Sequence, residues 1–412
     1  MTKKFEKLNL FIFAYWHDKG WKRFVGATVK IWDLAHNVAG LGHHVVLFLP
    51  KYHFPKEDIP FKLVQIPVLD FPFLRALSFN VFLTFFLIGH YFMLNPNVVY
   101  VRRGISIIPA IFAKFKKAMF LYEINDDPYP DRINFRSGLL SRLDGWIARK
   151  TDELSLSLCD AAFVITKQIG EKIVKKRRDV DQNKLHVLPS GTNTDLYQPL
   201  AQKECRLKLD LDASKKYIGF MGTLLDHQGV DVLIDAAPRV LQSIPNAVFV
   251  IMGEGPMKDK WRRRVEHLSL QEQFLFTGQV EYAETPLWIN AMDVCTAPFL
   301  IKAGLRSPVK IFDYLACAKP VVASRISGTT DLFAGSDAVC LIEPENRDAL
   351  ARALVDLLKN VGKVTEMGLI GRKLVETHYN RRVLAQKIMD TAHALQNPEG
   401  NGPDPHHQRQ TA

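Results

Sequence analysis

Residues 307–313 (Ser-Pro-Val-Lys-Ile-Phe-Asp) bring together a helix start, a cation and a carboxylate. Because Ser is a favoured N-cap and Pro a favoured first helical residue, we expect Ser307 to cap a helix that begins at Pro308. A helix N-terminus carries unpaired N–H groups and a partial positive charge, which suit a phosphate, and Lys310 would add a full charge there. Asp313 lies three residues further on the same helical face, where a carboxylate could hold a ribose diol. Taken alone, the segment is better explained as a capped amphipathic helix with a Lys310–Asp313 pair.

Glycines stand at further points where a ligand could meet the backbone. Gly222 ends one apolar strand-length run, Gly253 and Glu254 follow another, and Gly304 lies in the loop before the expected helix. Glycine turns at the C-terminal ends of strands cradle dinucleotide-like ligands. Each turn is a weak signal alone, since strand-to-helix turns need glycine in any case. The two turns and the helix start, in this order, predict a nucleotide-like ligand.

Apolar runs of strand length alternate with helix-length segments along the chain. This alternation predicts an α/β fold of parallel sheets with helices on both faces. The polar stretch 189–195 separates two series of strands, so we expect two doubly wound Rossmann-like domains that face each other across a ligand-binding cleft. The predicted strands are 8–15, 44–49, 63–68, 98–101, 119–124, 161–166 and 185–188, then 217–222, 248–252, 274–277, 294–298, 321–324 and 339–342.

The domain boundaries follow from these series. We place an N-terminal Rossmann-like, acceptor-side domain at residues 1–195 and a C-terminal Rossmann-like, ligand-binding domain at 196–380. Residues 381–396 predict a helix that returns to the first domain. Residues 397–412 are rich in Pro, Gly, His and Gln without periodicity, and predict a disordered tail.

The composition of the 412 residues, 47% hydrophobic and 24% charged, is that of a globular protein and excludes wholesale disorder, collagen and coiled coil. The five cysteines lie far apart, which argues against a disulfide framework and favours a reducing compartment. We therefore expect a cytoplasmic protein.

The net charge of +11 is concentrated in the first half, where residues 1–200 hold 28 Lys and Arg against 18 Asp and Glu. Such asymmetry indicates an anionic partner, either a membrane surface or a nucleic acid. Since no nucleic-acid-binding signature accompanies it, we expect no nucleic acid and favour anionic lipid on the inner face of the cytoplasmic membrane. The uncharged segment 76–93 is interpreted as a largely buried or membrane-grazing helix rather than a span.

Taken together, these motifs resemble the retaining GT-B glycosyltransferases of family 4 (glycosyl transferases group 1), over about residues 8–392. The resemblance depends on a spaced set of short motifs rather than on any single one. The matching positions are Gly26, 34–35, 42–45, 188–193, 222–223, 228–231, 253–256, 276–278, 307–313 and 319–324.

The resemblance implies a nucleotide-sugar donor in the C-terminal domain, with Lys310 and the backbone at 303–304 facing the diphosphate and Asp313 holding the ribose. The nucleobase would lie near Val280. In the N-terminal domain, Gly26 would belong to the glycine loop.

The resemblance also places Arg102, Glu123 and Asn125 as acceptor-side or catalytic candidates. An equally weighted alternative makes Glu123 a structural carboxylate paired with Arg102 or Arg103.

The chain departs from the family pattern at three donor-site positions. Thr223 and Gln228 stand where the family commonly has Arg and Lys, and Leu305 stands where the first glutamate of the usual pair would be. Either Lys310, Arg306 and the helix N-terminus carry the phosphate, or catalysis is weak, because losing a cation near a developing anion is costly.

The function expected is transfer of a sugar from a nucleotide-diphosphate sugar to a saccharide or lipid-linked acceptor, with retention of configuration, in cell-surface glycan or glycolipid synthesis. The alternative is a catalytically weak or inactive nucleotide-sugar-binding relative that acts as a regulatory or partner subunit. A nucleotide-sugar epimerase is a weaker third interpretation, and a NAD-dependent oxidoreductase is disfavoured because no GxGxxG opens a first helix.

No metal or other cofactor is expected. No cluster has metal-ligand spacing, and the family resembled is metal-independent. Residues 210–212 (Asp-Leu-Asp) mimic a metal-binding motif, but we place them at the surface before the first strand of the second domain.

Overall fold

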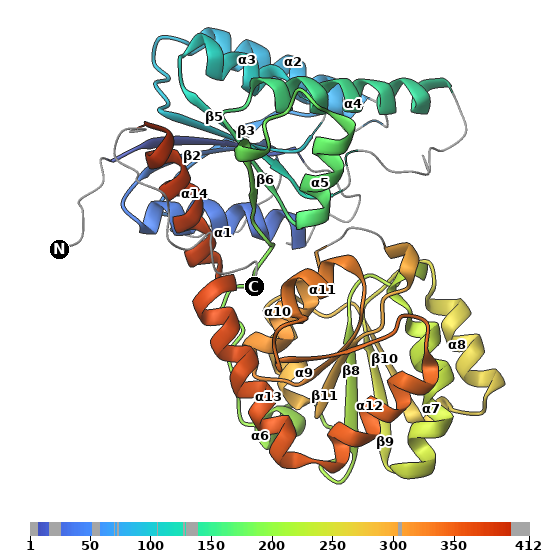
Figure 1. The fold of residues 1–412 in the computed structure, drawn as a ribbon. Helices are drawn as coiled ribbons and strands as arrows, with labels where there is room; N and C mark the ends of the chain where they lie inside the picture. The colour runs from blue at the N-terminus through green and yellow to red at the C-terminus, as the bar shows by residue number, and fades with distance from the viewer. Residues whose placement is uncertain are drawn as a thin grey trace. The chain divides into compact units, whose positions relative to one another are not determined.

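The computed structural model describes residues 7–15, 26–51, 58–69, 71, 74–104, 106–126, 128, 139–303 and 307–396. For residues 26–28 and 139–144 it describes the backbone only. The chain divides into two compact units (Figure 1): unit 1 comprises residues 1–164, 170–188 and 382–412, and unit 2 comprises residues 165–169 and 189–381. The predicted tail, 397–412, lies outside the described residues.

Unit 1 is built on a parallel sheet in the order β3-β2-β1-β4-β5-β6-β7. Its strands are β1 (Asn9–Phe13), β2 (His44–Pro50), β3 (Lys62–Ile66), β4 (Val98–Arg102), β5 (Met119–Ile124), β6 (Ala161–Val164) and β7 (Leu185–Val187). Its helices are α1 (Gly26–Gly40), α2 (Leu74–Gly89), α3 (Ile108–Phe115), α4 (Leu139–Leu158), α5 (Lys167–Lys176), the short η1 (Gln182–Lys184) and α14 (Arg381–Gln396).

Alternate strand residues of unit 1 point to opposite faces of the sheet, and both faces are covered. On one face, Leu10 and Ile12 of β1 join a core with residues of α1 and α14. On the other, Phe13 packs edge-on against Phe112 of α3, and Phe48 against Phe86 of α2. This double cover explains why the strands are apolar without interruption (Figure 1).

The last helix, α14, is part of the unit 1 core although it follows all of unit 2 in the sequence. Its buried residues recur at helical spacing and belong to the same cluster as strands β1, β2 and β4: Leu384, Ala385, Ile388, Met389 and Ala392. The two ends of the chain therefore contribute to one hydrophobic core.

Unit 2 has a parallel sheet in the order β10-β9-β8-β11-β12-β13. Its strands are β8 (Lys216–Met221), β9 (Ala247–Met252), β10 (Phe274–Gly278), β11 (Val294–Ala297), β12 (Val321–Ser324) and β13 (Val339–Ile342). Its helices are α6 (Gln202–Lys208), η2 (Asp226–Gln228), α7 (Val230–Ser243), α8 (Lys258–His267), η3 (Gln271–Gln273), α9 (Thr285–Ala291), η4 (Ile301–Ala303), α10 (Val309–Ala316), α11 (Ser327–Phe333), α12 (Arg347–Lys359), α13 (Val361–Leu374) and η5 (Val375–Tyr379).

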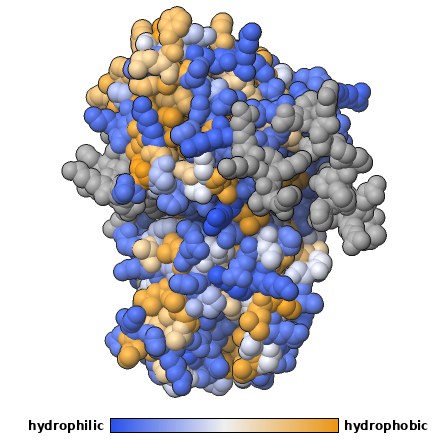
Figure 2. Space-filling view, turned by 90° about the vertical axis from the view of Figure 1, so that its left-hand side faces the viewer, coloured by the Kyte–Doolittle hydropathy of each residue, from blue (hydrophilic) through white to orange (hydrophobic). Residues whose placement is uncertain are grey.

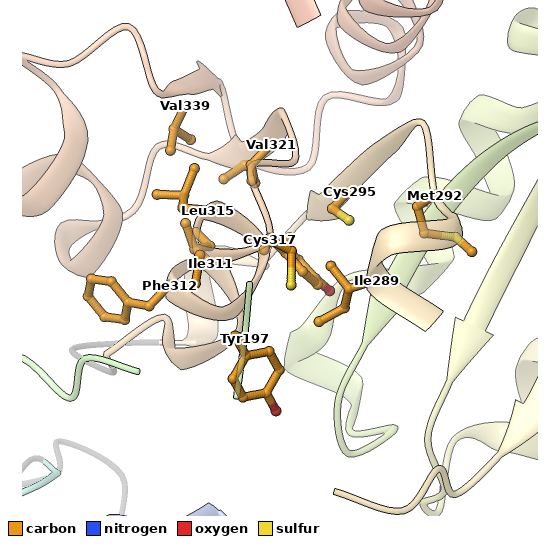
Figure 3. Close-up of a cluster of buried hydrophobic side chains, with 14 of the residues drawn as sticks. Tyr197, Ile289, Met292, Cys295, Ile311, Phe312, Leu315, Cys317, Val321 and Val339 are labelled. Carbon is orange, nitrogen blue, oxygen red and sulfur yellow. The ribbon is translucent and has the colours of Figure 1, made fainter. Parts of the chain in front are cut away.

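Two hydrophobic cores lie on opposite faces of the unit 2 sheet. One buries α7, α8 and α12 against residues such as Phe220 and Ile251. The other, drawn in Figure 3, packs Phe312 and Leu315 of α10 with Cys295 and Val321 of the sheet. Helix α10 is thus fixed by its apolar side, which sets the position of its polar residues.

The α/β architecture predicted from the sequence is confirmed. Each predicted apolar run overlaps an observed strand, and the ends of the two agree within two residues. In both sheets the strand order reverses beside the first strand, between β1 and β4 and between β8 and β11, which is the arrangement of doubly wound folds. None of the helices in the described part of the chain is long and apolar enough to cross a membrane.

Candidate functional site

The start of α10 differs from the sequence prediction by one residue. Pro308 occupies the N-cap position with ψ 65°, which is not helical, so the helix begins at Val309. Ser307 therefore precedes the cap, and its Oγ is buried without a hydrogen-bond partner among the described residues. The prediction that Ser307 caps a helix beginning at Pro308 is wrong for this reason.

Lys310, in the first turn of α10, has a buried side chain with 9% exposure. Its Nζ donates a hydrogen bond to Gln228 Oε1 at 2.6 Å and lies 3.8 Å from the centroid of the Phe220 ring. No carboxylate pairs with it within the described residues, and burial holds its pKa well below the usual value. The ammonium is satisfied by a neutral amide and an aromatic face, which leaves its charge uncompensated.

Gly222 keeps the backbone beside that ammonium free of side chains. Its φ is +146°, and a Cβ there would lie 2.9 Å from Lys310 Nζ. Gly253, with φ +140°, approaches Gly222 so closely that a Cβ would fall 2.0 Å from the Gly222 carbonyl oxygen. The ends of β8 and β9 consequently meet at glycine backbone near Lys310.

The loop after β8 is fixed by backbone hydrogen bonds. Leu224 N–H donates to the Glu254 carbonyl at 2.9 Å, and Gly222 N–H donates to Met252 at 2.9 Å. Thr223 between them is exposed. The Glu254 side chain pairs with Lys258 at 2.5 Å, one helical turn away.

Gln228 ends η2 and holds its side chain toward Lys310. The following Gly229 has φ +71°, and a Cβ there would lie 1.7 Å from the Pro298 carbonyl oxygen, so only glycine fits. Gln228, Gly222 and Lys310 therefore form one group, to which three elements contribute.

Asp313, one turn after Lys310 in α10, has different partners. It is buried and accepts a hydrogen bond from Thr192 Oγ1 at 2.5 Å. Burial raises its pKa to about 7, against the lowering effects of the Thr192 hydroxyl and the Arg381 charge. The Lys310–Asp313 pair that the simpler interpretation required is not formed.

The structure places the other predicted positions differently from one another. Val280 follows β10 and packs, half-buried, against the core that contains α10. Gly304, Leu305 and Arg306 lie outside the described residues. Gly26, predicted for the glycine loop of the first domain, is the first residue of α1.

A second polar group lies in unit 1, where β4 and β5 end side by side. The register pairs Arg102 with Glu123. Glu123 is buried, accepts a hydrogen bond from Tyr100 Oη at 2.9 Å and forms an ion pair with Lys30 of α1. With the Asn125 amide turned so that its oxygen faces the guanidinium, Arg102 donates to that oxygen from Nη2 at 2.7 Å and from Nε at 2.8 Å.

The charge state of Glu123 follows from these partners. Burial alone would raise its pKa, but the charges of Lys30 and Arg102 and the hydrogen bonds from Lys30 and Tyr100 lower it to about 2. A carboxylate held in this way stays ionised at neutral pH. It is a strong hydrogen-bond acceptor and a weak base.

The structural alternative named Arg102 or Arg103 as the partner of Glu123. Arg102 lies opposite Glu123 in the register, and its charge lowers the Glu123 pKa. Arg103 instead pairs with Asp152 at 2.8 Å and with Asp126, and Glu123 has a further ion pair with Lys30. Tyr100 could have been found from the sequence, because it lies two residues before Arg102 on the same face of one strand. Lys30 gave no such signal.

No group of three or more His, Cys, Asp or Glu residues in the described part of the chain is placed to hold a metal ion. In the 210–212 segment, the Asp212 carboxylate accepts hydrogen bonds from Ser214 N–H at 2.8 Å and Ser214 Oγ at 2.7 Å. That carboxylate therefore caps a local turn.

Comparison with known proteins adds two family matches. A family described as "Glycosyl transferases group 1" matches residues 215–360, in unit 2. A family described as "Glycosyltransferase Family 4" matches residues 25–196, most of them in unit 1.

Two curated relatives illustrate the similarity. A GDP-mannose-dependent alpha-(1-6)-phosphatidylinositol monomannoside mannosyltransferase of Mycolicibacterium smegmatis is 28% identical over 211 residues, 50% of this chain and 55% of that protein. The lipopolysaccharide core biosynthesis mannosyltransferase LpsB of Rhizobium meliloti is 25% identical over 245 residues, 58% of this chain and 62% of that protein. The chain thus spans little more than half the length of these relatives.

Solved structures share the fold. Anabaena Alr3699/HepE in complex with UDP and glucose has a TM-score of 0.71 at 15% identity and covers 93% of this chain and 99% of its own. WaaG, a glycosyltransferase involved in lipopolysaccharide biosynthesis, has a TM-score of 0.70 at 18% identity, with the same coverage. At these identities the likeness concerns the fold.

Proposed function

The chain belongs to the family 4 glycosyltransferases with the GT-B fold, and from that premise we propose that it transfers a sugar from a nucleotide-diphosphate sugar to a saccharide or lipid-linked acceptor. The observation that carries the proposal is the buried ammonium of Lys310, which has no carboxylate partner among the described residues and lies beside glycine backbone at the start of α10. A diphosphate is an anion of the right charge for such a group.

Unit 2 would hold the donor mainly through its diphosphate. Lys310 supplies the charge, and Gly222 leaves the backbone open to a phosphate oxygen. Gln228, which replaces the cation common at its position, keeps the ammonium in place through its 2.6 Å hydrogen bond. Asp313 is proposed to hold the ribose hydroxyls, with Thr192 orienting its carboxylate.

The chemical step is proposed to proceed with retention of configuration. Negative charge grows on the leaving diphosphate while the sugar becomes oxocarbenium-like, so the protein must position the donor and stabilise an anion. Lys310 does the second task in a dry environment, where its charge has the largest effect. No step requires a metal ion.

The acceptor-side groups are proposed to be those of unit 1. Glu123 stays ionised at neutral pH, so its role would be to accept a hydrogen bond from an acceptor hydroxyl. The Arg102 guanidinium, which donates to Asn125, would bind an anionic part of the acceptor. Such a pair fits a phosphorylated or lipid-linked saccharide.

The names of similar proteins suggest which donor sugars to test first. The Mycolicibacterium relative is named for GDP-mannose and a phosphatidylinositol monomannoside, and HepE was solved with UDP and glucose. We propose a role in cell-envelope glycolipid or polysaccharide synthesis, at the cytoplasmic face of a membrane.

The test is a thermal-shift and calorimetric screen over UDP- and GDP-sugars with the wild-type chain and two lysine variants. We expect one donor to raise the Tm by linkage, and Lys310→Ala to abolish the shift. Lys302→Ala is the matched control, because Lys302 is exposed in nearby η4 and pairs with Asp226. An undiminished shift in Lys310→Ala would remove Lys310 from the donor site.

One observation favours a second candidate, a weak or inactive donor-binding relative. Thr223 and Gln228, in the segment after β8, are uncharged where the family commonly has cations. The proposed donor site therefore relies on the charge of Lys310 from α10. Such a protein would bind the nucleotide sugar but release no sugar to acceptor or water. Product analysis by mass spectrometry separates it from an active transferase.

A further inference from the structure

We propose that unit 1 docks on an anionic membrane surface through one apolar face formed by α2, the turn that follows it and α3. This inference deepens the proposed function by naming the partner that presents the acceptor, and it rests on that function for its biological meaning. We call this surface the α2–α3 face. Its apolar members are Leu77, Val81, Phe85, Ile88, Phe92 and Phe115.

Helix α2 is apolar on two opposite sides. At 100° per residue, Phe79, Leu83 and Leu87 fall within one sector, and these three side chains are buried. Phe85 and Ile88 lie on the other side and are 70% and 68% exposed. The core therefore explains only half of the hydrophobic residues of this helix.

The exposed side continues beyond the end of α2. Phe92, in the following turn, is 94% exposed, and Phe115 at the end of α3 is 72% exposed. Tyr91 joins the two segments, since its Oη donates to the Phe115 carbonyl at 3.3 Å and its ring packs edge-on against Phe112. The exposed aromatic residues thus belong to one continuous surface rather than to separate positions.

Figure 2 shows hydrophobic residues gathered at the upper end of the molecule, the end at which Figure 1 places α2 and α3. Several large apolar side chains exposed on neighbouring elements indicate a surface that a partner covers. The question is which partner fits.

The charge beside the face is mainly positive. The sequence has no Asp or Glu between residues 71 and 122. Lys117 is exposed at the end of α3, and Lys116 lies over the Tyr91 ring at 4.0 Å. Lys114 is also exposed and pairs with the half-exposed Asp160 at 3.3 Å. Exposed aromatic side chains with lysines at their border match a bilayer interface that contains anionic lipid.

The same charges disfavour a second copy of this chain. A two-fold contact through the α2–α3 face would bring the lysines of one copy near those of the other, and like charges across an interface are repulsive. Anionic headgroups instead neutralise all of them at once.

The dimensions of α2 define the mode of contact. Its 16 residues extend about 24 Å at 1.5 Å per residue, which is short of the ~30 Å hydrocarbon core. The helix would lie in the plane of the membrane, with Phe85, Ile88 and Phe92 inserted among the headgroups and the opposite side still packed on the sheet.

The test is flotation of the full chain, without donor, with vesicles of phosphatidylcholine alone or with 30% phosphatidylglycerol, at low and at high salt. We expect flotation with the anionic vesicles at low salt and little with phosphatidylcholine. Phe85→Ser/Ile88→Ser should weaken binding about tenfold or more. Lys114→Gln/Lys117→Gln should weaken it by about fivefold per lysine at low salt only. Val361→Ser/Leu369→Ser, comparably exposed positions of α13 in unit 2, should bind as the wild type does.

Several outcomes would overturn the proposal. These are no flotation of the wild type, equal loss in the α13 control, or a shift from dimer to monomer in Phe85→Ser/Ile88→Ser by light scattering. The last result would assign the face to a second copy. Because flotation needs no nucleotide sugar, and because the face variants should keep the donor-induced Tm shift, failure here is distinguishable from failure of the proposed transferase function.

A second measurement detects contact with the membrane directly, rather than through the loss of binding in a variant. Phe92→Cys carrying an environment-sensitive fluorophore should shift its emission to the blue on addition of anionic vesicles. The same label at Leu369→Cys should not respond. A response of equal size at both positions would contradict docking through the α2–α3 face.

Discussion

Single residues at the start of α10 carry the charge on which donor binding depends. Lys310 is buried between an amide oxygen and an aromatic ring, and its pKa is lowered by that burial. An ammonium in this setting destabilises the folded state, because desolvation is not repaid by an opposite charge. It is tolerated where binding of an anion supplies the missing charge.

Replacing Lys310 by Met should therefore separate stability from binding. We expect Lys310→Met to be as stable as the wild type or more stable by about 1 kcal/mol, because the buried charge is removed and the volume is kept. Affinity for the nucleotide sugar should fall about 30-fold or more, as a charged hydrogen bond contributes about 2 kcal/mol. Urea unfolding and calorimetry measure the two effects. A large loss of stability with unchanged affinity would make Lys310 a structural residue.

Asp313 should make stability depend on pH. Its folded pKa of about 7 lies above the unfolded value of 3.8, so between these pH values the unfolded state releases a proton that the folded state keeps. The resulting penalty grows with rising pH by up to about 1.4 kcal/mol per unit until it levels off near pH 7.

The isosteric Asp313→Asn tests this, because an amide oxygen still accepts from Thr192. Its stability relative to the wild type should be clearly higher at pH 7.5 than at pH 5, measured by urea unfolding. An equal difference at both pH values would show that the carboxylate does not titrate between them.

At the scale of elements, the glycine turns at Gly222, Gly229 and Gly253 position the polar residues around Lys310. Helix α14, from the end of the chain, completes the core of unit 1. Gly229 is the most tightly constrained of these glycines, with φ +71° and the Pro298 carbonyl oxygen only 1.7 Å from the position of an added Cβ. Gly229→Ala should destabilise the protein by about 2 kcal/mol or more and weaken donor binding, since η2 must shift and carry Gln228 with it. Gly335→Ala is the control, because nothing lies within 4 Å of its added Cβ. The urea unfolding midpoints of the two variants measure the difference in stability. Equal midpoints would show that the loop accommodates a side chain at position 229 without cost.

Helix α14 is held to unit 1 beside a histidine pair. His43 and the buried His393 have ring centroids 5.7 Å apart, and Leu8 N–H donates to His43 Nδ1 at 3.2 Å, which requires that nitrogen to be unprotonated. Burial, then the charges of His393 and Lys7, lower the pKa of His43. Stability from this contact is complete above the unfolded value of about 6.5 and is lost as the pH falls through the lower folded pKa.

Hydrogen exchange of α14 peptides should therefore show less protection at pH 5 than at pH 7.5, after correction for intrinsic rates. His43→Gln, which keeps an acceptor for Leu8, should show a smaller difference. Protection that does not change with pH in the wild type would exclude the histidine pair as a pH-sensitive contact.

The elements were more predictable from the sequence than the partners of the site residues. Apolar runs and glycine turns are local signals, and they located the strands and the Gly222 and Gly253 turns. The partners Lys30 of Glu123 and Thr192 of Asp313 lie 93 and 121 residues away, and no local pattern points to them. The cap at Ser307 was mispredicted because propensity ranks residue types, whereas the backbone angles of Pro308 set where the helix begins.

At the scale of the whole molecule, the two units carry different chemistry. The excess of positive charge in residues 1–200 and the exposed α2–α3 face both belong to unit 1. The buried Lys310 and the glycine turns belong to unit 2. This division is the one expected of a protein that takes a soluble nucleotide sugar and an acceptor at a membrane surface.

The most direct measurement of the central claim is transfer of radiolabelled sugar from a panel of nucleotide sugars, GDP-mannose and UDP-glucose among them, into a membrane lipid extract. The account predicts labelled lipid-linked product with the wild-type chain and with Lys302→Ala, and none above background with Lys310→Ala. Labelled product formed equally well by Lys310→Ala, or tight donor binding by the wild type with no sugar released to any acceptor or to water, would contradict it.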